Sequence, residues 1–131
     1  MKLPIDPNSI KGFLDHEEGL ALYEKTLTYS KLGPCLEIGS YCGKSALYIG
    51  TATKLNKQTL FSIDHHRGSE EQQPGEEYCD PDLINDKGDG IDTLPYFLET
   101  IKRSKETIKR RKEEEDWIFF FFLEIGNVVQ D

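Results

Sequence analysis

The chain has 131 residues, of which 37% are hydrophobic and 31% charged, and its formal net charge is -8. This length suits one globular domain, 1–131, and is too short for two. The longest unbroken apolar run, 117–123, is far below the roughly 18 residues of a membrane-spanning helix, so we expect no membrane partner. Pro4 and Asp6 interrupt the N-terminus before a signal-peptide core could form, so we expect a cytoplasmic protein.

The net charge is concentrated in one segment, 64–92, which holds ten acidic residues against Arg67 and Lys87. Such a segment repels phosphate backbones, so we expect no nucleic-acid partner. A basic cluster at 102–112 is followed at once by four acidic residues, which favours a solvated helix face. The cysteines are odd in number, form no C-x-x-C pair and indicate reduced thiols: Cys35, Cys42 and Cys79.

The first two predicted helices flank a predicted strand. A capping box at 15–18 opens the first helix, and Gly33 with Pro34 ends it. Cys35–Ile38 is a short apolar stretch that predicts a buried strand. The segment 43–54 predicts a second amphipathic helix. The apolar stripes of the two helices are Leu20, Tyr23 and Leu27 in the first, and Leu47, Thr51 and Leu55 beside Tyr48 and Ala52 in the second.

A second strand is predicted at Leu60–Asp64, which completes the order strand, glycine loop, helix, strand. That order predicts neighbouring parallel strands in an α/β sheet. The polar segment 65–90 is longer than most connections between elements. Loops of this length tend to be functional or disordered. Asp92 or Thr93 then caps a helix, and 117–123 predicts a third strand. The stripe of this last helix is Leu94, Phe97, Leu98, Ile101 and Ile108, with Pro95 in its first turn.

The most informative stretch is the glycine loop 39–43 between the first strand and the second helix. Glycines at this turn let the backbone approach a ligand, and a helix N-terminus offers unpaired N–H groups. Asp64 follows Gly43 by 21 residues, where a carboxylate can accept both hydroxyls of a ribose. Together they favour a nucleoside-type cofactor. The pyrophosphate pattern G-x-G-x-x-G is absent, so an NAD-dependent oxidoreductase is the weaker alternative.

The pattern E-x-G-x-x-x-G from Glu37 to Gly43 resembles motif I of class I S-adenosylmethionine-dependent methyltransferases, and LEIGSYCGKSALYIG looks like the catechol O-methyltransferase group. The stretch DHHRGSEE at 64–71 is similar to a group of bacterial methyltransferase-like proteins. The resemblance covers roughly 12–104. It implies a Rossmann-like parallel sheet and S-adenosylmethionine as cofactor. The implied cofactor-binding residues are Glu37 at the amino group, Gly39, Ser40 and Gly43 along the methionine portion, Asp64 at the ribose, and the adjacent Tyr41 and His65.

Other parts of the chain limit this expectation. His65 and His66 lie near carboxylates, but their spacing matches no usual zinc pattern, so we expect no metal site. The same histidines are candidates for a general base by position alone, and the sequence assigns no catalytic residue. The charge tract 105–116 and Phe119–Phe122 do not resemble the family, so we expect a partial domain. The alternatives are therefore an active methyltransferase with a small-molecule acceptor, or a cofactor-binding fragment without turnover.

Overall fold

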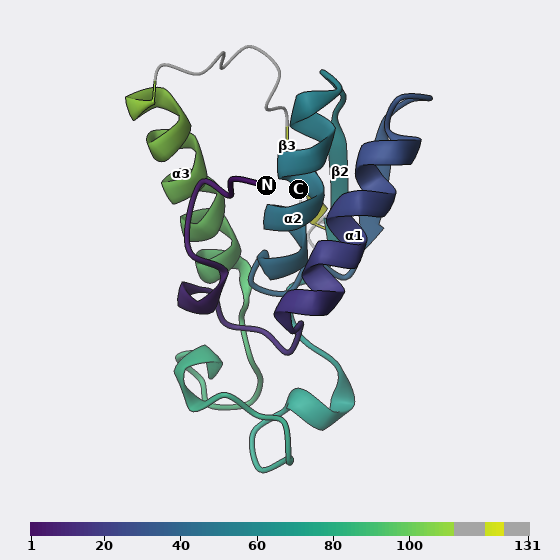
Figure 1. Cartoon of the computed structure of the whole chain (residues 1–131). Coiled ribbons are helices and arrows are strands. Elements are labelled where there is room, and N and C mark those ends of the chain that lie inside the picture. The colour runs from purple at the N-terminus through teal and green to yellow at the C-terminus, as the bar shows by residue number, and fades with distance from the viewer. Residues whose placement is uncertain (112–119, 125–131) are drawn as a thin grey trace, which may run out of the picture.

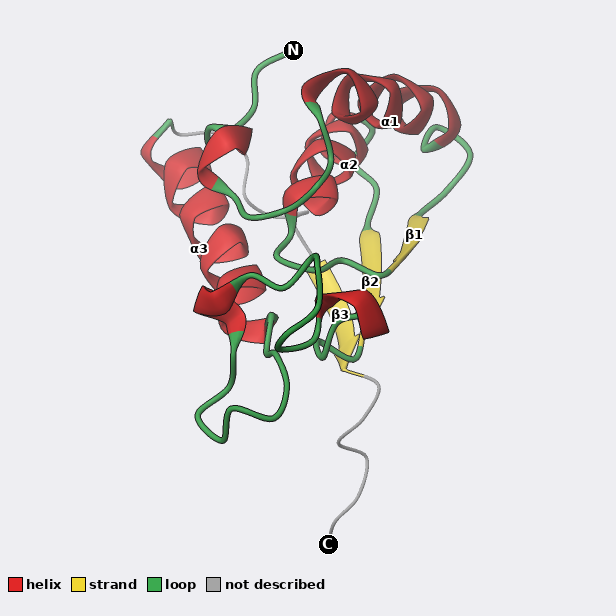
Figure 2. Cartoon of the chain, turned by 90° about the horizontal axis from the view of Figure 1, so that it is seen from below, coloured by secondary structure: helices red, strands yellow, loops and turns green. Residues whose placement is uncertain are grey.

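The computed structural model describes residues 1–111 and the backbone of 120–124, and it shows α-helices packed on one side of a small parallel sheet (Figure 1). The helices are α1 (His16–Tyr29), α2 (Lys44–Leu55) and α3 (Leu94–Arg110). The strands are β1 (Cys35–Ile38), β2 (Leu60–Asp64) and β3 (Phe120–Glu124). The described part of the chain is thus a mixed α/β structure, seen from below in Figure 2.

The sheet has the order β1-β2-β3, and both pairs of neighbouring strands are parallel. Cys35 is in register with Leu60, and Leu60 is in register with Phe120. The parallel β1-α2-β2 unit confirms the order predicted from the sequence. The third strand was predicted at 117–123, and β3 spans Phe120–Glu124. Residues 117–119 lie outside the described residues. The three strands described are fewer than a full Rossmann-like sheet contains.

Helix α1 begins as predicted, because Asp15 and Glu18 form both hydrogen bonds of a capping box. The helix packs against α2 at a point of very close approach. A side-chain carbon on Gly19 would lie 2.3 Å from the ring of Tyr48, so only glycine fits there. His16 Nδ1 lies 2.9 Å from the hydroxyl of the same tyrosine. This contact fixes α1 across the outer face of α2.

The core between α2, α3 and β2 differs from the predicted apolar stripes. Leu55 and Leu98 are exposed, whereas the polar residues Thr100 and Ser104 are buried. Their hydroxyls are satisfied by backbone carbonyls: Thr100 donates to Cys42 at 2.8 Å, and Ser104 donates to the carbonyl of Thr100 at 2.8 Å. Polar residues whose hydroxyls are satisfied in this way can replace leucine at buried positions.

Strand β1 was expected to be buried, and this expectation is wrong for one of its faces. Leu36 and Ile38 are 60% and 78% exposed, while Glu37 between them is buried. Side chains alternate between the two faces of a strand, and in the described part of the chain the helices cover only the face that carries Glu37. Leu36 and Ile38 therefore lie on the opposite face of β1 from the helices.

The long connection between β2 and α3 contains no long helix or strand, yet it has a defined structure. It contains two short 3₁₀ turns, at Glu70–Gln72 and Pro81–Leu83, and an antiparallel bridge between Ile84 and Ile91. Leu83 and Ile91 are buried in one cluster, which anchors the connection to the domain. In Figure 1 it forms the projecting teal and green layer below the helices.

The helices and the cysteines can also be compared with the sequence expectations. Within the described part of the chain, no helix is long and apolar enough to cross a membrane. All three cysteines are free thiols, as expected. Burial raises the pKa of Cys42 to about 12, so this thiol stays protonated and unreactive at neutral pH.

Candidate functional site

The glycine loop lies at the carboxyl end of β1, beside the end of β2. Its first residue, Gly39, is fixed to β2 by a hydrogen bond from its amide to the carbonyl of Ile63 at 2.8 Å. Gly39 has φ of +86°, a left-handed conformation that favours glycine. A side-chain carbon built at Gly39 would meet no atom of the described residues within 4 Å. The backbone at this turn therefore faces open space.

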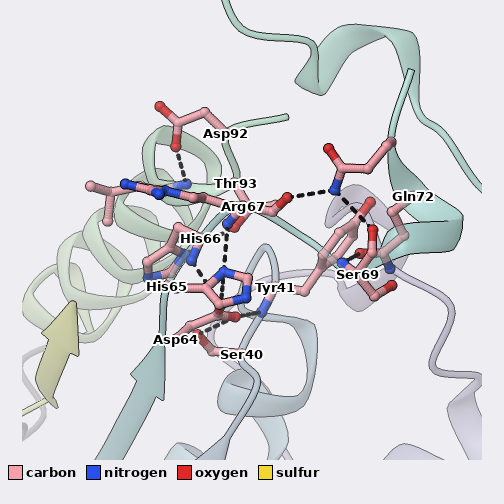
Figure 3. Close-up of polar contacts among 12 residues, drawn as sticks. Ser40, Tyr41, Asp64, His65, His66, Arg67, Ser69, Gln72, Asp92 and Thr93 are labelled. Carbon is pink, nitrogen blue, oxygen red and sulfur yellow. Dashed lines mark hydrogen bonds and ion pairs between the residues drawn. The ribbon is translucent and has the colours of Figure 1, made fainter. Parts of the chain in front are cut away.

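Asp64, at the end of β2, holds this loop in place (Figure 3). One carboxylate oxygen accepts a hydrogen bond from the Tyr41 amide at 2.8 Å and a long one from the Ser40 hydroxyl at 3.5 Å. The other oxygen accepts from the His66 amide at 2.8 Å. The side chain of Asp64 is 12% exposed. Because an ionised carboxylate has about four acceptor positions, Asp64 retains capacity for a further donor.

Glu37 lies under the loop, on the face of β1 that α2 covers. Its two oxygens accept hydrogen bonds from the hydroxyls of Ser45 and Ser62, the second at 2.8 Å. Burial raises the pKa of Glu37, the two serine hydrogen bonds act in the opposite direction, and the charge of Asp64 raises it further. The carboxyl group is thus held rigidly in a buried position.

Gly43 plays a different part from Gly39, although both have left-handed backbone conformations. A side-chain carbon on Gly43 would lie 3.1 Å from Thr100 of α3, so this glycine lets the start of α2 pack closely on α3. Gly43 is the N-cap of α2 and supplies no side-chain cap. The amides of a helix's first turn have no intrahelical partner, and the helix dipole makes this end attractive to an anion.

The two adjacent histidines point in different directions. His65 is exposed, and its Nδ1 accepts a hydrogen bond from the Arg67 amide at 2.9 Å. Neutral His65 therefore carries its proton on Nε2. His66 is 2% exposed, and its Nδ1 lies 2.9 Å from the hydroxyl of Thr93. Its Nε2 is buried and has no hydrogen-bond partner among the residues that the structure describes.

Neither histidine is well placed to act as a general base. Nε2 of His65 is occupied by a proton in the neutral ring, and His66 has no contact with solvent at Nε2. A metal role finds no geometric support either. In residues 1–111, no three His, Cys, Asp or Glu side chains form a group that could hold a metal ion.

Two cavities lie near the site, one beyond the end of β2 and one against the glycine loop. One, of about 760 Å³, lies beside His65 and is lined mainly by the polar residues of the long connection. The other, of about 390 Å³, is lined by Tyr41 together with residues that the sequence analysis did not single out. These include Lys11 and Phe13, which precede α1, and Tyr78 from the long connection. The sequence signal for Phe13 and Tyr78 is that each is an aromatic residue inside an otherwise polar segment.

The structure thus brings together most of the residues expected at a cofactor site. Ser40, Tyr41 and Asp64 are in direct contact, Glu37 lies in a buried position on β1, and His65 lies beside Asp64. Residues 36–119 match the family model described as a methyltransferase domain. The match includes β1, the glycine loop, α2, β2 and α3.

Proposed function

The chain belongs to the methyltransferase domain family, and we propose that it binds S-adenosylmethionine at the glycine loop and methylates a small-molecule acceptor. The observation that carries this proposal is the hydrogen bond between the Tyr41 amide and the Asp64 carboxylate. It joins the loop after β1 to the end of β2, so that an open backbone and a carboxylate share one site. Within the family, we place the chain near the bacterial proteins that share its 64–71 stretch.

The residues present fit such a cofactor. The open space at Gly39 allows the methionine portion to approach the backbone, with Ser40 alongside. The uncapped start of α2 suits the carboxylate of that portion. We propose that Asp64 uses its remaining acceptor capacity for the ribose hydroxyls, and that Glu37 holds the amino group through a water molecule. The cavity beside His65 has room for a nucleoside.

When bound, S-adenosylmethionine supplies an electrophilic methyl group on its sulfonium centre. The residues of this chain hold and orient it, because Asp64 and the loop are fixed to each other before any ligand arrives. Catalysis then rests mainly on alignment of the methyl donor with the acceptor nucleophile. A hydroxyl acceptor also needs a proton acceptor, and His65 would serve only after its bond to the Arg67 amide breaks.

The charge of the long connection and the free cysteines indicate the kind of methyl acceptor and the cellular compartment. The connection 64–92 carries ten acidic residues against two basic ones, which disfavours a nucleic acid as acceptor. We propose a single domain in the cytoplasm, where free thiols such as Cys42 persist. Cofactor binding without turnover remains the second candidate, because the sheet described has only three strands.

Titration calorimetry with S-adenosylhomocysteine and with NAD tests the proposal. We expect S-adenosylhomocysteine to bind and NAD not to bind. Gly39→Val should abolish binding, because the branched side chain fills the open space at the loop. Gly75→Val is the matched control, since Gly75 has φ of +89° and no neighbour within 4 Å, and it suffers similar backbone strain. Equal loss in both variants, or binding of NAD alone, would contradict the assignment.

A further inference from the structure

The cavity of about 390 Å³ beside Tyr41 is walled by three aromatic rings from three separate segments. The ring centre of Phe13 lies 5.8 Å from that of Tyr41 and 5.7 Å from that of Tyr78. Phe13 and Tyr78 are 61% and 49% exposed. Exposed aromatic rings that converge on one hollow mark a binding surface more often than single exposed residues do.

The charged residues around these rings are predominantly acidic. Glu77 and Asp80 line the cavity together with Lys11. The Lys11 ammonium is held by Asp80 at 2.7 Å and by Asp82 at 2.8 Å, so its charge is matched within the protein. These four side chains together carry a net negative charge, and the three acidic ones lie in 64–92, the segment that holds the chain's whole negative excess. Such a surface repels anions and attracts cations.

We propose that this aromatic cavity binds an organic cation, specifically a methylated or protonated ammonium group of the methyl acceptor. Aromatic ring faces attract cations through their quadrupole, and quaternary ammonium groups are commonly held by several aromatic rings. A metal ion is a poor occupant, because ring faces are weak ligands for hard cations and the cavity presents no group of three ligating side chains in the described chain.

The link to the acceptor rests on the proposed function and on the position of Tyr41. Its ring lines the aromatic cavity, while its amide is bonded to Asp64 at the proposed cofactor site. A molecule that places its cationic group among the three rings therefore extends toward the glycine loop. Its nucleophilic atom is a separate group of the same molecule, because an ammonium nitrogen has no free electron pair.

Tetramethylammonium chloride is a suitable probe, titrated by NMR at constant ionic strength. We expect saturable binding that perturbs the Phe13, Tyr41 and Tyr78 ring signals, and no comparable binding of tert-butanol, a neutral molecule of similar shape. Phe13→Leu and Tyr78→Leu should each weaken binding about three- to tenfold, because leucine retains apolar area and lacks the ring face. Tyr29→Leu is the matched control, since Tyr29 is equally exposed on α1 and does not line the cavity.

Glu77→Gln should weaken tetramethylammonium binding, and Glu24→Gln on α1 should not. Equal binding of tert-butanol, or equal loss in Tyr29→Leu, would overturn the inference. S-adenosylhomocysteine binding, measured separately, keeps the two proposals apart. If S-adenosylhomocysteine binds and tetramethylammonium does not, the aromatic cavity is not a cation site while the proposed function stands. If only tetramethylammonium binds, the cation site stands, but its assignment to a methyl acceptor fails with the proposed function.

Discussion

His66 and Thr93 lie 27 residues apart and are joined by two hydrogen bonds, one from the Thr93 amide to the His66 carbonyl at 3.0 Å and one between His66 Nδ1 and the Thr93 hydroxyl at 2.9 Å. They close the long connection between β2 and α3 into a loop whose two ends meet. Because His66 follows Asp64 and Thr93 is the N-cap of α3, this pair fixes the connection to the site.

Thr93→Val should destabilise the domain by about 1 to 3 kcal/mol, because it leaves the buried His66 ring with no hydrogen-bond partner at either nitrogen. Thermal melts measure this change, and limited proteolysis should show faster cleavage between 67 and 92. Thr93→Ser retains the hydroxyl and should stay close to the parent protein. If Thr93→Val and Thr93→Ser melt together, the side-chain bond contributes little.

Asp64→Asn should lower both stability and cofactor affinity. An asparagine offers one acceptor oxygen where Asp64 now serves the Tyr41 and His66 amides, so we expect a loss of about 1.5 to 3 kcal/mol in unfolding free energy. Affinity for S-adenosylhomocysteine, measured well below the melting temperature, should fall by at least tenfold. Asp6→Asn is the control, because the exposed Asp6 accepts from the Asn8 amide, asparagine can do the same, and Asp6 lines neither cavity near the glycine loop. Unchanged affinity would remove Asp64 from the site.

Glu37→Gln should raise the melting temperature at pH 8 and change it much less at about pH 4, below the ordinary glutamate pKa of 4.5. Burial raises the pKa of Glu37 above its value in the unfolded chain, so the folded state binds the proton more tightly. The stability of the parent protein therefore falls as pH rises from the unfolded pKa through the folded one, and glutamine removes this dependence. Glu24→Gln, at an exposed position on α1, should leave the pH profile of the melting temperature unchanged.

The same Glu37→Gln variant should bind S-adenosylhomocysteine more weakly, because the neutral amide attracts the amino group of the ligand less than a carboxylate does. A gain in stability with a loss of affinity is the pattern expected of a buried group retained for binding. A variant that is less stable at pH 8 and binds normally would show that the carboxyl group serves only to hold Ser45 and Ser62.

Gly19→Ala should destabilise the domain, although alanine is the better helix former by about 1 kcal/mol. The added carbon would lie 2.3 Å from the Tyr48 ring, and such overpacking costs about 1 to 3 kcal/mol. Urea denaturation measures the difference in unfolding free energy. Ala21→Gly, at an exposed position of the same helix, measures the difference in helix propensity between alanine and glycine without the contact to Tyr48. A stabilised Gly19→Ala variant would show that α1 moves away from α2 at little cost.

The elements that depend on local signals were predicted closely. Cys35–Ile38 and Leu60–Asp64 are strands with the bounds that the sequence indicated, and the capping box at 15–18 opens α1. These signals lie within a few residues of one another, so they are visible in the sequence. The position of the glycine loop and Asp64 at one edge of the sheet also followed from the βαβ order, because parallel strands end at the same edge of a sheet.

Features that depend on distant segments were not predictable in this way. The exposure of Leu36 depends on which face of β1 the helices cover, and the burial of Thr100 depends on how closely Gly43 approaches α3. The aromatic cavity joins Phe13 to Tyr78, and no local pattern links residues so far apart. The bonds that occupy Asp64 were missed as well, since they come from backbone amides, which every residue possesses.

The ion pairs that Lys11 forms with Asp80 and Asp82 at the aromatic cavity span 69 and 71 residues. Contacts between residues far apart in sequence carry a large loop-closure entropy, so they form late in folding. The α1-α2 and β1-β2 contacts close shorter loops, so we expect them to form earlier. We therefore expect amide hydrogens around Lys11 and Tyr78 to exchange with solvent through local opening, without global unfolding. Such opening gives a ligand a route into the cavity while the glycine loop and Asp64 stay in place.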